Sequence, residues 1–232
     1  MCTDKPAPQR EIQITDDGSA TLYLPQLDEH YHSVKGAITE SRHIYRDCGY
    51  LFRASQSPGP VTILEIGLGT GMNAAVTAMA ANDPSPVRYI ALELYPLSLE
   101  EVDSMQLDRF VDPRLLRDLH QCPWDEPRQL TPAFTLEKRR CDFTQCDLPS
   151  GIDVVYFDAF APEKQPEMWS PELFRRIFHA MNPGGVLTTY CAKGSIRRML
   201  SAIGFSVERL PGPPGGKREI IRACLLYTSD AA

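Results

Sequence analysis

The chain has 232 residues, of which 43% are hydrophobic, and a formal net charge of −6. This length and apolar content suffice for one well-packed core, so we expect one α/β domain with a small appendage. The negative charge argues against a protein that coats nucleic acid non-specifically, but it leaves room for a local basic surface.

No stretch approaches the roughly 18 apolar residues that a membrane span needs, and residues 1–10 are polar and contain proline. We therefore expect neither a membrane span nor a signal peptide. The seven cysteines include no Cys-x-x-Cys pair, which favours free thiols in a reducing compartment over a metal site. These features predict a cytoplasmic protein without a bound metal.

The first 56 residues are predicted to form the appendage. Alternating apolar residues over 12–24, interrupted by Asp16-Asp17-Gly18-Ser19, predict a short β-hairpin. Residues 28–45 are dense in polar aromatic and charged side chains, and helical spacing predicts a helix from about 37 to 52. Two interpretations stay open for this segment: a cap helix with ordinary surface charge, or a lid that recognises a substrate.

A glycine-rich turn follows, in the segment 61–73 with the sequence VTILEIGLGTGMN. The pattern predicts a buried strand, a tight turn and a helix start, and glycines there let a ligand approach the main-chain N–H groups. The G-x-G-x-G spacing differs from the G-x-G-x-x-G of dinucleotide sites. The carboxylate of Glu65 would repel a diphosphate but would attract a cation, such as the ammonium or sulfonium of S-adenosylmethionine.

Three later predicted strands lead to carboxylates. The strand 87–94 carries Glu93 near its end, where a nucleoside cofactor places its ribose hydroxyls. Asp142 follows the strand 133–139, at a position where an adenine amino group could be read, although a surface turn is the alternative. The most apolar strand, 152–158, ends at Asp158, which we take as the catalytic candidate because it points into the ligand crevice of such a sheet.

The rest of the chain supplies further helices and strands. Helices are predicted over 96–105 and 196–203 and from Ser170 to the turn at 182–185, and strands over 186–191, 205–210 and 218–223. We divide the chain into an N-terminal segment, 1–56, a main domain, 57–224, and a tail, 225–232. The tail continues no pattern and is expected to be disordered or non-native.

This order of elements resembles the class I S-adenosylmethionine-dependent methyltransferase domain. The resemblance spans about residues 60 to 223 and rests on the glycine turn, Glu93, Asp142, Asp158 and the Asn-Pro-Gly-Gly-Val at 182–186. It implies a Rossmann-like α/β fold: a mostly parallel sheet of seven strands, the last one antiparallel, with helices on both faces.

A narrower resemblance covers about residues 12 to 223. The segments 67–73, 93–97 and above all 157–169, FDAFAPEKQPEMW, are similar to the methyltransferase part of the MnmC family, as are 31–33, 40–42 and 216–219. This resemblance implies transfer of a methyl group to the exocyclic amine of 5-aminomethyl-2-thiouridine, or its oxygen analogue, at the wobble position of tRNA. The FAD-dependent oxidoreductase half of the fused family members has no counterpart in this sequence, so we expect no FAD, and that step is expected to be absent or supplied by another chain.

The resemblance, together with the positions of the acids at the carboxyl ends of the strands, predicts which residues bind the cofactor and the substrate. We expect the cofactor to be held by Glu65, Gly67, Gly69, Gly71, Asn73, Glu93, Asp142 and Asp158. Asp158 would also lie beside the incoming amine, with Tyr31 and Glu40 as further catalytic candidates. The tRNA would be contacted by His32, Lys35, Arg42, Tyr190, Arg197, Arg198, Lys217 and Arg218. Two alternatives remain: an NAD-dependent oxidoreductase using the same glycine turn, and a non-catalytic partner subunit with a methyltransferase fold.

Overall fold

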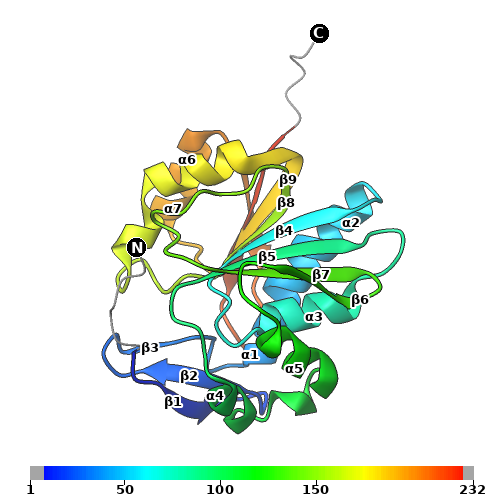
Figure 1. Cartoon of the computed structure of the whole chain (residues 1–232). Coiled ribbons are helices and arrows are strands. Elements are labelled where there is room, and N and C mark those ends of the chain that lie inside the picture. The colour runs from blue at the N-terminus through cyan, green and yellow to red at the C-terminus, as the bar shows by residue number, and fades with distance from the viewer. Residues whose placement is uncertain (1–7, 227–232) are drawn as a thin grey trace.

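The computed structural model describes residues 8–226 (Figure 1). Its main sheet has eight strands in the order β10-β11-β9-β8-β4-β5-β7-β6. The middle strands are parallel, β11 is antiparallel to both of its neighbours, and β6 is antiparallel to β7. The strands are β4 (Val61–Ile66), β5 (Val87–Glu93), β6 (Pro127–Thr131), β7 (Phe134–Arg140), β8 (Ile152–Phe157), β9 (Met181–Thr189), β10 (Ser206–Pro211) and β11 (Glu219–Cys224).

Seven of these strands match the sequence-based prediction, including the antiparallel last strand. The eighth, β6, was not predicted, since no element was assigned to residues 128–131. Its segment is mostly exposed and forms only the outer edge of the sheet, so it carries no alternating apolar pattern. The sheet therefore has the seven strands that the resemblance implies and one added edge strand, β6.

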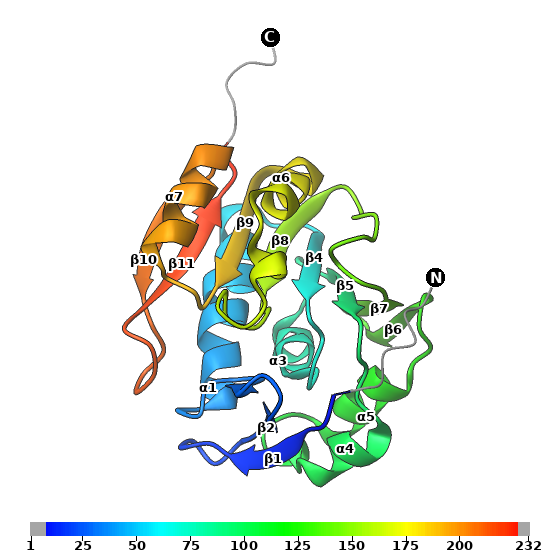
Figure 2. The ribbon, with the colours of Figure 1, turned by 90° about the vertical axis from the view of Figure 1, so that its left-hand side faces the viewer.

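Helices cover both faces of the sheet (Figure 2). One face packs against the helix that begins at Ala37 and against α3 (Met72–Ala80) and α5 (Pro113–Gln121). The opposite face packs against α6 (Pro171–Ala180) and α7 (Gly194–Ile203). Side chains alternate between the two cores along each central strand, so Tyr156 faces the first core while Phe157 faces the second.

The N-terminal hairpin is present as predicted. β1 (Glu11–Ile14) and β2 (Ala20–Leu24) pair antiparallel, and β3 (Glu29–His30) adds a short third strand. Figure 2 shows this small sheet lying across the edge where the central strands end. The segment is thus placed over the edge at which ligands bind in open α/β sheets.

The predicted helix from about 37 to 52 is longer and differently wound. It runs without a break through α1 (Ala37–Glu40), η1 (Ser41–Leu51) and α2 (Phe52–Gln56), and η1 is a π-helix. In an α-helix, residues five apart point about 140° away from each other. In a π-helix the hydrogen bonds run from i to i+5, so such residues come close to one face. Glu40 and Tyr45 are five residues apart and both are buried.

The helices predicted over 96–105, from Ser170 and over 196–203 are present as α4 (Leu99–Ser104), α6 and α7 with different bounds. In α4 the Ser98 side chain and Glu101 form a capping box, Ser170 caps α6, and α7 ends at Gly204. The other short helical turns are η2 (Leu107–Arg109) and η3 (Pro166–Trp169). No helix within 8–226 is both long and apolar enough to cross a bilayer.

One turn and the tail differ from expectation in detail. The Asn-Pro-Gly-Gly stretch at 182–185 was predicted as a turn before the strand, whereas it forms the bulged beginning of β9. Leu225, the first residue assigned to the tail, still exchanges backbone hydrogen bonds with Gly184 and Gly185. Residues 227–232 of the predicted tail lie outside the described residues.

Candidate active site

A cavity of about 500 Å³ lies at the carboxyl ends of β4, β5, β7 and β8, beneath the N-terminal hairpin. Its wall includes Glu93, Asp142 and Asp158, so the three strand-end carboxylates meet at one cavity, as the strand order predicts. A second hollow, of about 660 Å³ between α4 and α5, is lined by none of the predicted site residues. The first cavity is therefore the candidate active site.

The glycine turn forms the floor of this cavity. Gly67 and Gly69 line it, with φ values of +88° and +50° that favour glycine. A Cβ atom on Gly69 would lie 2.9 Å from the Tyr31 ring, which closes the space above it. Gly71 does not line the cavity; a Cβ there would lie 2.9 Å from Nε2 of His120, so this glycine serves the packing of α5.

Glu93 and Asp142 are fixed by the backbone around them. Glu93 accepts hydrogen bonds from the N–H of Gly69 (2.9 Å) and of Tyr95 (2.8 Å), one on each oxygen. Asp142 Oδ1 accepts from the N–H and the hydroxyl of Thr144, at 2.9 and 2.7 Å. Each carboxylate oxygen has more than one lone pair, so both side chains can accept further hydrogen bonds from a ligand in the cavity.

Asp158 is the end of a chain of hydrogen bonds from the core. The Tyr45 hydroxyl donates to its Oδ1 at 2.6 Å, and Asn73 Nδ2 donates to its Oδ2 at 2.8 Å. The same Asn73 amide donates to Oε1 of Glu65 at 2.9 Å. Glu65 is fully buried and lies outside the cavity wall, so it touches the site only through Asn73.

Burial dominates the electrostatics of these acids. Burial raises the pKa of Asp158, while the hydrogen bonds from Tyr45 and Asn73 and the charge of Lys217 oppose that rise. Burial also raises the pKa of Glu65 well above its usual value, against the opposing effect of the hydrogen bond from Asn73. A carboxylate that is partly desolvated yet firmly oriented, as Asp158 is, can bind a cationic group strongly and exchange a proton with it.

The hairpin supplies the roof of the cavity. Tyr31 and His32 both line it, and the Tyr31 ring meets the Phe160 ring edge-on at 5.3 Å. The Tyr31 hydroxyl accepts from Nε of Arg10 at 3.0 Å, and burial raises the pKa of Tyr31 to about 12. His32 Nε2 lies 2.7 Å from the Thr70 hydroxyl, and burial lowers the pKa of His32. Residues of the N-terminal segment thus line the cavity, which favours the lid interpretation over a simple cap.

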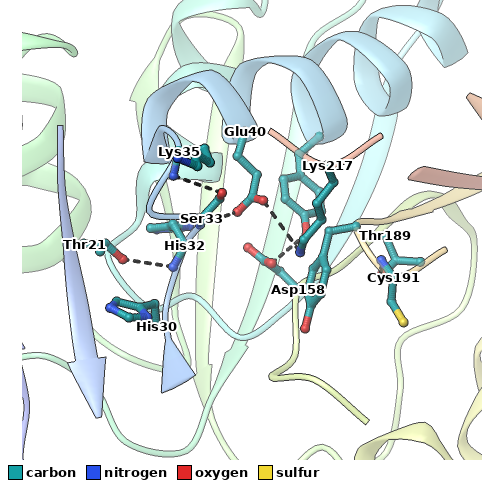
Figure 3. A network of polar contacts seen from close by, with 12 residues as sticks. Thr21, His30, His32, Ser33, Lys35, Glu40, Asp158, Thr189, Cys191 and Lys217 are labelled. Atoms are coloured by element: carbon teal, nitrogen blue, oxygen red, sulfur yellow. Dashed lines mark hydrogen bonds and ion pairs between the residues drawn. The ribbon is translucent and has the colours of Figure 1, made fainter. Parts of the chain in front are cut away.

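A second group of charged side chains lies beside Asp158, and of Glu40, Asp158 and Lys217 only Asp158 lines the cavity. Figure 3 shows Glu40, Asp158 and Lys217 pointing toward one another. Nζ of Lys217 lies 4.0 Å from Oε2 of Glu40 and 3.4 Å from the centre of the Tyr190 ring. Oε1 of Glu40 accepts from the Ser33 N–H, and burial raises the pKa of Glu40.

The predicted tRNA-binding basic residues do not gather at one place. Lys35 forms an exposed ion pair with Asp16, and Arg42 donates to the carbonyl of Phe110. Arg197 and Arg198 line a separate hollow of about 400 Å³ on α7, and Arg218 is exposed in the loop before β11. Only Lys217 of this set reaches the Asp158 group. Contacts of the others with phosphates stay predictions.

Sequence reasoning missed several residues of the site. Tyr45 was taken as part of the apolar face of a helix, whereas its hydroxyl holds Asp158. Arg10 lies in a stretch that reads as a polar terminus, yet it joins Tyr31 to Glu101 and to the carbonyl of Tyr95. A hydroxyl within an otherwise apolar helical stripe was the one available signal, since a buried tyrosine needs a hydrogen-bond partner.

The cysteines, histidines and acids of the described part of the chain are the candidate ligands of a metal ion. The six cysteines within 8–226 are free thiols. Over the same residues, no three His, Cys, Asp or Glu side chains are grouped so that they could hold one metal ion.

Comparisons with known proteins agree with this geometry. A family model described as S-adenosyl-L-methionine-dependent methyltransferase matches residues 136–225. The tRNA 5-methylaminomethyl-2-thiouridine biosynthesis bifunctional protein MnmC of Cupriavidus necator is 32% identical over 212 residues, which are 84% of this chain and 31% of the relative. The MnmC protein of Pseudomonas savastanoi is 30% identical over 96% of this chain and 36% of its own length.

The crystal structure of MnmC2 from Aquifex aeolicus aligns with a TM-score of 0.71 and 25% identity, over 97% of this chain and 73% of that one. The chain is an MnmC-like methyltransferase domain. The MnmC-like chain spans about a third of the length of the curated relatives it matches. The family description favours S-adenosylmethionine over NAD as the cofactor.

Proposed function

We propose that this MnmC-like chain transfers the methyl group of S-adenosylmethionine to the exocyclic amine of 5-aminomethyl-2-thiouridine, or its oxygen analogue, at the wobble position of tRNA. The observation that carries the proposal is one cavity in which Glu93, Asp142 and Asp158 meet above a glycine turn. The name of the curated relatives, which refers to 5-methylaminomethyl-2-thiouridine in tRNA, supports the choice of substrate.

The cavity suits an adenosyl ligand. Its wall combines apolar side chains, including Ile66, Leu92 and Phe143, with the two anchored carboxylates of Glu93 and Asp142. Apolar surfaces can enclose an adenine ring, while Glu93 at the end of β5 can accept hydrogen bonds from ribose hydroxyls. Asp142 lies at the end of β7, where it can accept a hydrogen bond from the adenine amino group.

When bound, the sulfonium cofactor supplies a methyl group that is already activated. The chain's own task is alignment, which can provide on the order of 7–11 kcal/mol in a well-oriented site. Tyr45 and Asn73 each hold one oxygen of Asp158, so this carboxylate has little rotational freedom. Asp158 can therefore orient an amine at the cavity wall with precision.

Proton transfer needs more than Asp158. A primary alkylamine is mostly protonated at neutral pH and must lose a proton before it attacks, yet a neighbouring carboxylate favours the protonated form. Asp158 thus binds and orients the amine and receives or relays its proton. We propose that four further side chains contact the substrate base: Tyr31, His32, Glu40 and Tyr190.

Binding of tRNA is assigned to the basic residues outside the cavity. Arg197 and Arg198 line one hollow with Arg209, and Lys35 and Arg218 are exposed. Phosphate contacts release counterions, so tRNA affinity should fall with salt. Reversing the charge of Arg198 should weaken tRNA binding at low salt and reduce that dependence. Unchanged affinity and slope would remove Arg198 from the interface.

The test is methyl transfer to tRNA whose wobble uridine carries the 5-aminomethyl group but lacks the methyl group on its amine. The chain is incubated with this tRNA and labelled S-adenosylmethionine, and the nucleosides are separated. We expect label in 5-methylaminomethyl-2-thiouridine and almost none with Asp158→Asn. A thermal shift with S-adenosylhomocysteine shows whether that variant still binds cofactor. Label only in nucleosides other than 5-methylaminomethyl-2-thiouridine and its oxygen analogue, or no label with a protein that binds the cofactor, would refute the proposal.

We assign the oxidation of the precursor to another protein. We propose that a carboxymethylaminomethyl precursor is processed by a separate oxidoreductase, and that this chain acts on the aminomethyl product alone. Substrate tRNA carrying only the carboxymethylaminomethyl group should therefore stay unlabelled until an oxidoreductase is added.

A further inference from the structure

The cationic end of Lys217 lies in an unusual environment for an exposed loop residue. Its Nζ is 3.4 Å from the centre of the Tyr190 ring and 4.0 Å from Oε2 of Glu40. The Lys217 charge also acts on Asp158, whose carboxylate points toward Lys217 together with that of Glu40 in Figure 3. Two acids and an aromatic face thus surround one ammonium group, which is the composition of sites that recognise organic cations.

Glu40 is the strongest sign that this is a binding site. Its side chain is only 3% exposed, and Oε2 accepts no hydrogen bond from residues 8–226. That oxygen is directed at Lys217, but 4.0 Å is too long for a hydrogen bond. A buried carboxylate oxygen without a donor is costly, so a cation that approached more closely would be stabilised there.

Lys217 reaches this place from the solvent side. Its side chain is 41% exposed, and it belongs to the loop between β10 and β11. The backbone of the loop is fixed, because the Gly212 N–H donates to the carbonyl of Arg218 and a Cβ on Gly212 would collide with the carbonyl of Lys217. The flexible four-carbon stem of Lys217 can still move its ammonium without moving the loop.

We propose that Glu40, Asp158 and Tyr190 form a binding site for a primary alkylammonium group, which Lys217 fills in the free protein and a substrate's ammonium takes over. The inference rests on the proposed function, since the substrate of that reaction carries an aminomethyl group. It adds that the amine enters by displacing a cation of the protein itself.

The exchange has a physical advantage. Ionised acids at this depth need a neighbouring positive charge, because a buried carboxylate without one is strongly disfavoured. Lys217 supplies that charge before the substrate arrives, and the incoming ammonium supplies it afterwards. The site therefore stays charge-compensated throughout, at the expense of a weaker apparent affinity for the amine, since only the fraction of molecules with Lys217 withdrawn can bind it.

The test measures binding of ethylammonium chloride, without tRNA or cofactor, by thermal shift and by titration followed with NMR. Sodium chloride at equal ionic strength is the reference. Lys217→Ala should bind ethylammonium at least about tenfold more tightly than the wild type, which corresponds to the site being filled by Lys217 about nine-tenths of the time. Lys217→Ser serves as a second variant should the alanine variant fail to fold.

Two further variants complete the design. Adding Glu40→Gln to Lys217→Ala should abolish the gained affinity, while Arg128→Ala, which removes an exposed cation paired with Glu126, should behave as the wild type does. Equal ethylammonium affinity in the wild type and both Lys217 variants, or full affinity without Glu40, would overturn the proposal. So would a higher KM for tRNA together with a smaller salt dependence in Lys217→Ala, because these mark a phosphate contact.

Failure of this proposal and of the proposed function can be told apart. Ethylammonium binding requires neither methyl transfer nor tRNA, so a negative result leaves the nucleoside assay to decide the function. Conversely, a protein that binds ethylammonium in the predicted order of variants but methylates no tRNA would retain the amine site and lose the assigned substrate.

Discussion

Tyr45→Phe is the most informative single change in this molecule. The Tyr45 hydroxyl donates a 2.6 Å hydrogen bond to Oδ1 of Asp158, and this bond lowers the pKa of a carboxyl group that burial raises. A hydrogen bond to a charged group contributes about 1.5–3 kcal/mol. At 1.36 kcal/mol per pKa unit, its loss should raise the pKa of Asp158 by about 1–2 units.

The assay is the pH dependence of kcat for methyl transfer, which reports groups in the enzyme–substrate complex. If Asp158 acts as the carboxylate, the acidic limb of the profile should move upward by about 1–2 pH units in Tyr45→Phe, with activity regained at higher pH. Tyr50→Phe is the matched control, since Tyr50 is equally buried on the same helix but donates to the carbonyl of Ser85, away from the cavity.

The pH dependence of the melting temperature tests the same hydrogen bond. Because the folded-state pKa of Asp158 is raised, its contribution to stability is present at low pH and is lost as pH rises through that pKa. Tyr45→Phe should therefore lose more melting temperature, relative to the wild type, at neutral pH than at acidic pH. An acidic limb that stays in place, or an activity loss equal at all pH values and matched by Tyr50→Phe, would refute the reasoning.

Three other predictions follow from single contacts. Glu65→Gln should raise the melting temperature more at pH 8 than at pH 5, because burial raises the pKa of Glu65 and its ionisation costs up to about 1.4 kcal/mol per pH unit; equal shifts would contradict this. Burial lowers the pKa of His120 from 6.5 to about 4, so its stabilising contribution is lost as pH falls through that range. In His120→Gln the melting temperature should therefore depend less on pH between about 6.5 and 4 than it does in the wild type. Gly69→Ala should weaken S-adenosylhomocysteine binding in calorimetry, since its Cβ would lie 2.9 Å from Tyr31; Gly151→Ala, at φ +77° with its nearest contact at 3.8 Å, should not.

The convergence of Glu93, Asp142 and Asp158 could be predicted from the sequence because parallel strands impose it. Each strand was recognisable by its apolar run, and the carboxyl ends of parallel strands lie at one edge. Alternation along the strands also fixes which face each side chain takes. The same reasoning correctly placed the glycine turn beneath these acids, as the cavity wall shows.

What the sequence could not provide depends on geometry between distant segments. An apolar pattern does not distinguish a π-helix from an α-helix, so the hydroxyl of Tyr45 could not be aimed at Asp158. Glu65 was expected to hold the ligand, but its strand position directs it into the core, where Asn73 intervenes. Lys217 was predicted to contact phosphate, which stays a prediction, but nothing in the sequence indicated that its ammonium lies 4.0 Å from Glu40 and 3.4 Å from the centre of the Tyr190 ring.

The residues of the candidate active site come from both the main sheet and the N-terminal segment. The glycine turn and the strand-end acids belong to the main sheet, whereas Tyr31, Glu40 and Tyr45 come from the first 56 residues. Asp158 is held by one residue from each part, Tyr45 and Asn73. A domain cut at residue 57 would keep the cradle for a nucleoside but would leave Asp158 without its shortest hydrogen bond and the cavity without its roof. The N-terminal segment is thus as much a part of the candidate active site as the sheet that it covers.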